Sequence, residues 1–134
     1  MSRSSVPSVC PYCGVGCGLF IEVEDGVVTG LEYMRDHPTS EGALCPKGNA
    51  CLDIVYHPER LRYPLKRVNG ELERTTWDEA LDLVASNLSR VQSESGPGAL
   101  GFLASAKATN EENYLFQKLA RLLGTNNVDH CARL

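Results

Sequence analysis

Residues 9–18 read Val-Cys-Pro-Tyr-Cys-Gly-Val-Gly-Cys-Gly, and this stretch decides how the first third of the chain folds. Three cysteines and three glycines within ten residues predict a tight loop rather than a helix or a strand. On its C-terminal side, residues 19–24 and 27–33 alternate apolar and charged side chains around Asp25-Gly26, a dipeptide typical of a type I′ hairpin turn. The sequence therefore predicts a two-stranded hairpin that supports a cysteine-rich loop.

The composition is that of an ordinary globular chain and argues against two classes of protein. The chain has 134 residues and is 43% hydrophobic and 22% charged, which suits about one domain. No apolar run approaches the roughly 18 residues needed to cross a bilayer, so no membrane association is expected. A net charge of -4 without a concentrated basic face makes nucleic acid an unexpected partner. The N-terminus carries no apolar signal segment, which predicts a cytoplasmic protein.

The residues after the hairpin predict a short helix and then a domain boundary. Leu-Cys-Pro-Lys-Gly at residues 44–48 opens a helical stretch that His57-Pro58 ends, because the residue before a proline is driven out of the helical region. We place the boundary near residue 60. The first domain is then expected to cover residues 1–60 and the second to cover residues 61–134.

The second domain has the outline of the opening of an α/β fold. Two capping boxes, Thr76 with Glu79 and Thr109 with Glu112, mark the starts of two helices. Strand, helix and a following extended segment make a βαβ unit. Because this sheet lacks further strands, the whole is predicted to be an α+β fragment. Its expected elements are a hairpin at residues 63–74 turning at Asn69-Gly70, a helix from residue 76 to 96, a buried strand at 99–104, a helix at 110–123 and an extended segment from residue 128.

Four cysteines have spacing that suggests a metal site. Nothing directs the chain to secretion, so a metal centre explains them better than disulfides do. Three close ligands plus a distant fourth suit a [4Fe-4S] cluster, whose corners a loop can cap, whereas structural zinc sites usually pair two and two. Zinc and unligated thiols remain alternatives. The four residues are Cys10, Cys13, Cys17 and Cys45, with two, three and 27 residues between them.

The other cysteines and the histidines have simpler interpretations. Cys51 could compete as the fourth ligand, but a buried cysteine on a short helix is the expected role. Cys131 follows His130, yet neighbours in sequence rarely point at each other, so a nucleophile with its base is not expected. His37 and His57 each precede a proline and are interpreted as turn residues.

Five segments together resemble the start of cytoplasmic formate dehydrogenase catalytic subunits, which belong to the molybdopterin oxidoreductases. The resemblance runs from about residue 9 to residue 134. The first two segments occur across the wider family, and the last two are more particular to formate dehydrogenases. The segments are Cys-Pro-Tyr-Cys-Gly-Val-Gly-Cys from residue 10, Leu-Cys-Pro-Lys-Gly from 44, Thr-Trp-Asp-Glu-Ala-Leu from 76, Thr-Asn-Glu-Glu-Asn-Tyr from 109 and Gly-Thr-Asn-Asn-Val-Asp-His-Cys-Ala-Arg-Leu from 124.

The resemblance implies a cofactor set and a reaction. Cys10, Cys13, Cys17 and Cys45 would bind a [4Fe-4S] cluster in a small β-hairpin subdomain, followed by the start of an α/β domain. Lys47, which taken alone could be a surface lysine, would lie on the electron path between cluster and pterin. The parent enzyme would interconvert formate and CO2 at molybdenum or tungsten held by a bis-molybdopterin guanine dinucleotide. It would pass electrons to a redox partner subunit.

The resemblance also makes the end of the chain informative. In the family, a cysteine or selenocysteine that ligates the metal follows the position of Leu134, and a catalytic histidine comes next. We therefore expect a chain cut just before a selenocysteine codon, with no catalytic residue of its own and no formate dehydrogenase activity alone. Two other classes stay open at this point: a complete small iron–sulfur electron carrier and a zinc-binding interaction module. The sequence leaves the electron acceptor and the choice of molybdenum or tungsten undecided.

Overall fold

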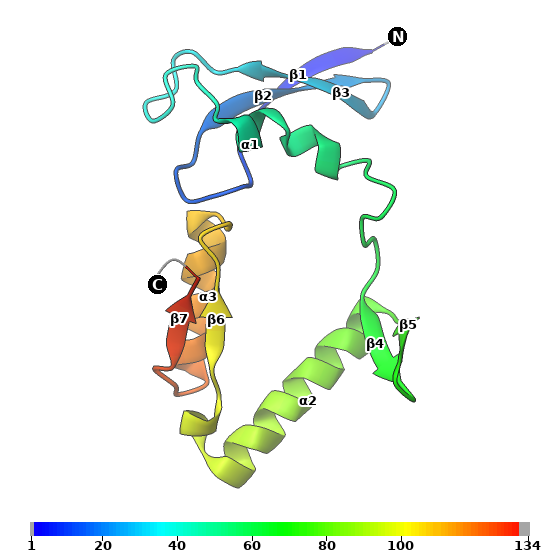
Figure 1. Cartoon of the computed structure of the whole chain (residues 1–134), viewed down its shortest axis with the longest axis vertical. Helices are drawn as coiled ribbons and strands as arrows, with labels where there is room; N and C mark the ends of the chain where they lie inside the picture. Colours follow the sequence, from blue (N-terminus) through cyan, green and yellow to red (C-terminus); the bar gives the residue numbers. More distant parts are fainter. Residues whose placement is uncertain (1, 132–134) are drawn as a thin grey trace.

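The computed structural model describes residues 2–131 and opens with a three-stranded antiparallel sheet, drawn in blue in Figure 1. Its second and third strands are the predicted hairpin. Asp25 (φ 49°) and Gly26 (φ 82°) both adopt the left-handed conformation that a type I′ turn requires, which confirms that turn. The strands are β1 (Arg3–Val9), β2 (Gly18–Glu24) and β3 (Val27–Tyr33).

The first strand, β1, was missed by the sequence pattern. It pairs antiparallel with β2, with Val6 opposite Ile21 and Val9 opposite Gly18. Its sequence, Arg-Ser-Ser-Val-Pro-Ser-Val, has no regular alternation, and Pro7 is tolerated because β1 is an edge strand that need not donate from every residue. The prediction of a two-stranded hairpin was therefore incomplete. The cysteine loop connects two paired strands instead of preceding the sheet.

A short helix and a 3-10 turn cover one side of this sheet (Figure 1); the sequence predicted the short helical stretch but not its position on the sheet. They are α1 (Pro46–Asn49) and η1 (Cys51–Ile54). A first hydrophobic core forms beneath them from Leu19, which is fully buried, together with Cys10 and Cys51. The core thus lies directly between the cysteine loop, the sheet and the helical segment.

The second half contains the predicted hairpin, two helices and a βαβ unit. Asn69 (φ 51°) and Gly70 (φ 93°) make the second hairpin turn. β6 and β7 pair in parallel with α3 between them, so the βαβ prediction is confirmed. The elements are β4 (Leu65–Val68), β5 (Glu71–Arg74), α2 (Trp77–Ser95), η2 (Pro97–Ala99), β6 (Phe102–Ala104), α3 (Asn110–Leu122) and β7 (Val128–His130).

Two local predictions in this half need correction. The strand expected at residues 99–104 is shorter, because residues 97–99 form the 3-10 turn η2 and pairing with β7 begins only at Phe102. The capping box at the start of α2 is half formed: the Thr76 hydroxyl accepts from the Glu79 N–H, but the Glu79 carboxylate accepts from Thr75 and Lys66 instead. At α3, by contrast, both hydrogen bonds of the box are present.

A second hydrophobic core holds the βαβ unit together. Leu100, Phe102 and Ala120 are buried, and the Phe102 and Phe116 rings meet edge to face with centroids 5.2 Å apart. In Figure 1 the chain follows an open ring, with the sheet and α1 at one end and α2 running diagonally at the other. No helix among residues 2–131 is both long enough and apolar enough to cross a membrane.

Candidate metal centre

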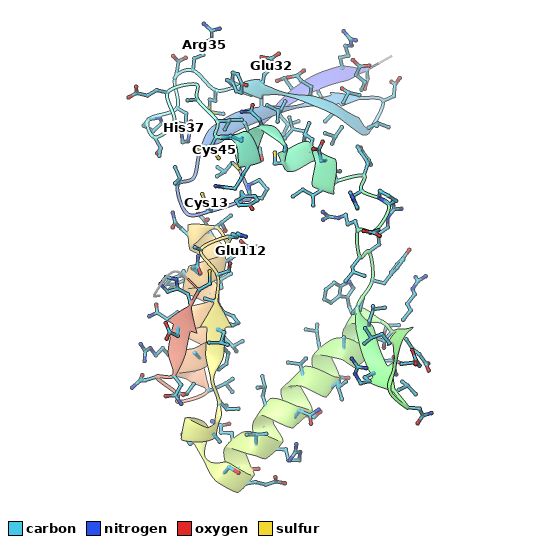
Figure 2. All side chains as sticks on the ribbon, viewed as in Figure 1. Cys13, Glu32, Arg35, His37, Cys45 and Glu112 are labelled. Carbon is cyan, nitrogen blue, oxygen red and sulfur yellow. The ribbon has the colours of Figure 1, made fainter. Side chains whose placement is uncertain are left out.

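The cysteine loop is a closed turn between β1 and β2. The Cys10 N–H donates to the Cys17 carbonyl at 2.8 Å, which fixes the two ends of the loop against each other. Gly16 has φ +69°, a left-handed conformation that suits glycine, and its N–H reaches the Cys13 carbonyl at 3.4 Å. Figure 2 shows Cys13 and Cys45 on the same side of the sheet. Local geometry therefore directs the loop toward the segment that carries the fourth cysteine.

The residue after the loop, Gly18, is locked by a turn that sequence reasoning did not connect to it. The Gly18 N–H donates to Ser40 Oγ at 3.2 Å, and Ser40 Oγ lies 3.3 Å from His37 Nδ1. A Cβ at position 18 would lie 2.3 Å from the His37 ring, so only glycine fits there. His37 lies in a turn, as predicted from its proline, and it also packs against the end of the loop.

The fourth cysteine is held by a side-chain clamp built on Asn49. The Asn49 Nδ2 donates to the carbonyls of Leu44 (3.0 Å) and Cys45 (3.2 Å), and its Oδ1 accepts from the Tyr33 hydroxyl at 2.7 Å. Asn49 thus ties the Cys45 segment to strand β3. Sequence reasoning missed Asn49, because its partner Tyr33 lies 16 residues away and leaves no local signal.

Electrostatics show that the four predicted cysteines share one region. Burial raises the pKa of the Cys17 thiol, and negative charge on Cys10, Cys13 and Cys45 raises it further. The backbone N–H of Gly48 lowers the pKa of the exposed Cys45 thiol, with further lowering from Lys47. Cys45 therefore loses its proton more readily than an ordinary cysteine does to form the thiolate, which is the metal-binding form.

The chemistry of these thiols suits a metal centre, either a cluster or a single zinc ion. Within the described part of the chain, residues 2–131, no three His, Cys, Asp or Glu side chains are arranged to hold one metal ion. A tetrahedral zinc ion needs four sulfurs at about 2.3 Å, hence about 3.8 Å from each other. A cubane cluster instead takes one thiolate at each of four corners. Four cysteine thiols are soft sulfur donors, the donor type that iron–sulfur clusters use.

Lys47 and Cys51 lie at the edges of this region. The Lys47 ammonium lies 5.6 Å from the centre of the Tyr12 ring, a cation–π contact that brings it against the cysteine loop. Cys51 is 5% exposed in the first core, and burial raises the pKa of its thiol, as expected of a packing cysteine. Cys131 lies elsewhere, with Sγ 3.9 Å from Ser105 Oγ in the second half of the chain.

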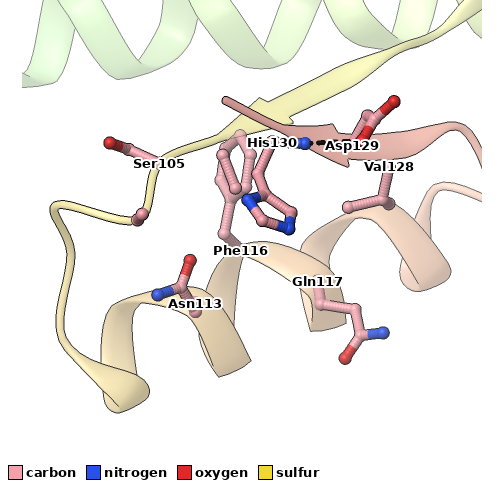
Figure 3. A pocket seen from close by; sticks show the side chains of 9 residues that line it. Ser105, Asn113, Phe116, Gln117, Val128, Asp129 and His130 are labelled. Carbon is pink, nitrogen blue, oxygen red and sulfur yellow. Dashed lines mark hydrogen bonds between the residues drawn. The ribbon is translucent and has the colours of Figure 1, made fainter. Parts of the chain in front are cut away.

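The second half contributes a hollow, lined by both apolar and polar side chains, at the carboxyl ends of β6 and β7. It has a volume of about 340 Å³, and Figure 3 shows Asn113, Phe116, Gln117 and His130 around it. The backbone N–H of His130 donates to the Asp129 carboxylate at 2.8 Å. In open α/β sheets, ligands bind outside the carboxyl ends of parallel strands. The hollow is therefore in the position where such a fold receives a ligand.

Comparison with known proteins identifies both halves of the chain. Residues 4–57 match the molybdopterin oxidoreductase Fe4S4 domain, and residues 60–134 match the molybdopterin oxidoreductase family. An F420-dependent formate dehydrogenase 1 subunit alpha from Methanococcus maripaludis is 47% identical over the whole chain. The F420-dependent formate dehydrogenase subunit alpha of Methanocaldococcus jannaschii is 48% identical over the whole chain. A putative formate dehydrogenase of Staphylococcus aureus is 45% identical over 94% of it.

A solved structure supports the same fold. Acetylene hydratase from Pelobacter acetylenicus matches 93% of the chain and 18% of its own length, with a TM-score of 0.70 and 27% identity. The chain spans 19% of the length of the two archaeal relatives and 13% of the staphylococcal one. Because the two matched segments run from residue 4 to residue 134, the chain belongs to the molybdopterin oxidoreductase family.

Proposed function

We propose that Cys10, Cys13, Cys17 and Cys45 bind a [4Fe-4S] cluster. The observations that carry this proposal are the match of residues 4–57 to an Fe4S4 domain and the loop that the hydrogen bond from Cys10 to Cys17 closes. When bound, such a cluster stores and releases single electrons. The residues of the chain supply thiolate ligands, and Asn49 fixes the separate segment that carries Cys45.

Lys47 is proposed to lie on the electron path beside the cluster. Its ammonium is held against the Tyr12 ring, within the same loop as Cys10 and Cys13. A positive charge next to a cluster favours the reduced and therefore more negative state. Lys47 would also attract an anionic pterin cofactor.

The parent protein is proposed to be a formate dehydrogenase that interconverts formate and CO2. Oxidation of formate releases one proton and two electrons, which must leave singly through a cluster. The names of relatives 45–48% identical favour formate over other substrates of the fold, such as that of the structurally similar hydratase. Molybdenum or tungsten with two pterin nucleotides is the metal centre expected of the family. The hollow beside His130 is proposed to face that centre.

The electron acceptor is proposed to be a separate redox subunit, and an F420-reducing one is the first to test because two relatives are named as F420-dependent. Two further assignments belong to the proposal. The chain is divided near residue 60 into an iron–sulfur subdomain and an incomplete α/β domain. The protein works in the cytoplasm.

Metal analysis of the chain tests the cluster assignment. After anaerobic reconstitution with iron and sulfide, we expect about four iron and four sulfide per chain and a reduced-cluster signal in electron paramagnetic resonance. Serine at each of the four cysteines should abolish or deplete the cluster, whereas the matched control Cys51→Ser should load normally. One zinc per chain, or a loss in Cys51→Ser equal to that in Cys45→Ser, would overturn the assignment.

The chain alone is proposed to have no formate dehydrogenase activity. It corresponds to about a fifth of the length of its archaeal relatives. Viologen reduction by formate should therefore stay at the level of a control without protein, even when the cluster is fully loaded. Formate-dependent reduction above that control would show that the chain is catalytically complete.

A further inference from the structure

The cysteine loop touches the second half of the chain through one well-defined pair, Asn110 and Gly14. The Asn110 Nδ2 donates to the Gly14 carbonyl at 2.9 Å, although the two residues lie 96 positions apart. A Cβ built at position 14 would lie 2.7 Å from Asn110 Oδ1. The amide therefore occupies the place that any side chain at position 14 would need. Figure 2 shows the loop around Cys13 facing the end of α3 that carries Glu112.

Asn110 is itself held rigidly. It is the first residue of α3, directly after the cap residue Thr109, whose hydroxyl and N–H both bond to Glu112 in the complete capping box. The Asn113 amide donates to the carbonyls of Ala108 and Thr109 and fixes the approach to the helix. Because these hydrogen bonds fix the start of the helix, the Asn110 side chain offers the loop a hydrogen-bond donor at a fixed position.

Gly14 follows Cys13 directly, so a hydrogen bond to its carbonyl, which lies in the Gly14–Val15 peptide, restrains the backbone one residue beyond Cys13. The N-terminus of α3, which meets the loop at Asn110, carries the partial positive charge of the helix end and the carboxylates of Glu111 and Glu112. A reduced cluster carries one more negative charge than an oxidised one, and it is stabilised by nearby positive charge. The distance between loop and helix should therefore affect the reduction potential.

We propose that Asn110 is a positioning residue, which holds the Cys13 side of the cluster-binding loop against the N-terminus of α3. The cluster's potential then depends on the second half of the chain as well as on its four ligands. This inference rests on the proposed cluster function, and it assigns no ligand role to Asn110.

A double-mutant cycle on the cluster-free chain tests the contact itself. In Asn110→Ala the hydrogen bond is lost, and in Gly14→Ala the new methyl group displaces the amide. Each change should raise the alkylation rate of Cys13, followed by mass spectrometry, about two- to tenfold, the factor expected for one hydrogen bond. The double variant should react no faster than Asn110→Ala, because the same contact is already absent. Cys45 serves as an internal control, and Asn87→Ala on α2 is the matched asparagine control.

A second measurement uses the loaded chain and does not depend on activity. The midpoint potential of the cluster should shift in Asn110→Ala and in Gly14→Ala, and it should be unchanged in Asn87→Ala. Asn110→Leu keeps about the size of the side chain, adds no charge and cannot donate to the Gly14 carbonyl. It should shift the potential as well, and it replaces Asn110→Ala if that variant fails to fold by circular dichroism.

The outcomes separate this inference from the function on which it rests. A wild-type chain that takes up no iron and sulfide contradicts the cluster assignment. A wild-type chain that loads its cluster, with Cys13 alkylation and midpoint potential unchanged in both single variants, overturns the role of Asn110 alone. Multiplicative rate increases in the double variant would equally overturn it, because the two residues would then act independently.

Discussion

At the residue scale, Asn49 should matter for stability because one side chain makes three hydrogen bonds, to Leu44, Cys45 and Tyr33. Asn49→Ala removes all three, and we expect it to destabilise the first half of the chain by about 1–3 kcal/mol. It should also reduce the cluster loading of the chain. Urea unfolding and iron content check the two effects.

Tyr33→Phe is the matched partner in that experiment, because it removes one of the three hydrogen bonds and keeps the ring. Its cost should be about 0.5–1.5 kcal/mol, clearly smaller than that of Asn49→Ala. Equal costs for the two variants would mean that the bonds to Leu44 and Cys45 contribute nothing. If neither variant changed the free energy of unfolding, the Asn49 hydrogen bonds would not hold the Cys45 segment in place.

The sequence could nominate ligands but not the residues that position them. Cysteines are rare and reactive, so the spacing of Cys10, Cys13 and Cys17 carries information by itself. Asn49 and Asn110 are common residue types, and their partners lie 16 and 96 residues away. Only a folded chain shows which of its asparagines face the loop. The role of Ser40 at Gly18 was invisible for the same reason.

At the scale of elements, the start of α2 should be sensitive to acid through Glu79. The Thr75 hydroxyl and the Lys66 ammonium both donate to its carboxylate and lower its pKa below the ordinary value of 4.5. A lowered pKa in the folded state means that the ionised carboxylate stabilises the fold above pH 4.5. That contribution is lost as pH falls through the folded-state value.

Glu79→Gln should therefore reduce stability at pH 7 and make the difference in stability between pH 7 and pH 3 smaller. Thermal unfolding followed by circular dichroism at both pH values measures this. Glu94→Gln, at the other end of α2 in an exposed pair with Arg90, is the control and should change stability little at either pH. A pH dependence in Glu79→Gln identical to that of the wild type would contradict the assignment.

The end of α3 gives a second prediction for an element. Gly124 has φ +77°, and a Cβ there would also lie 3.3 Å from the Cβ of Pro97. Gly124→Ala should cost about 1–2 kcal/mol, since a left-handed residue with a side chain is strained. Gly98→Ala is the matched control, because its Cβ would meet nothing within 4 Å and should be neutral or slightly stabilising. Chemical denaturation of the two variants compares them directly; equal costs would contradict the argument.

Elements with a local signature were predictable, and those defined by pairing were not. Two to four adjacent residues are enough to specify the turns at Asp25-Gly26 and Asn69-Gly70 and the cap at Thr109. The strand β1 has no such signature. It forms because its backbone pairs with the edge of β2. The Thr76 cap half formed because Glu79 found stronger partners in Lys66 and Thr75, one of them 13 residues away.

At the scale of the whole molecule, residues 2–131 contain two separate small cores instead of one. Leu19 anchors the first beside the cysteine loop, and Phe102 belongs to the second inside the βαβ unit. On α2, which lies between the two cores in the sequence, Leu81 and Val84 are 60% and 55% exposed. Such a chain should not unfold as one two-state unit. Its two halves should respond separately to core mutations and to the cluster.

Hydrogen exchange measured by mass spectrometry tests this separation. Leu19→Ala should cost about 2–5 kcal/mol and Phe102→Ala about 3–5 kcal/mol, because each leaves a cavity in a packed core. Protection should fall in residues 3–55 for the first variant and in residues 97–130 for the second.

Removing the cluster should imitate Leu19→Ala and spare the βαβ unit except near Asn110, where the loop meets α3. Loss of protection across both halves in either variant would instead mean that the two cores fold as one, and the contact between Asn110 and Gly14 would then be part of a single cooperative structure.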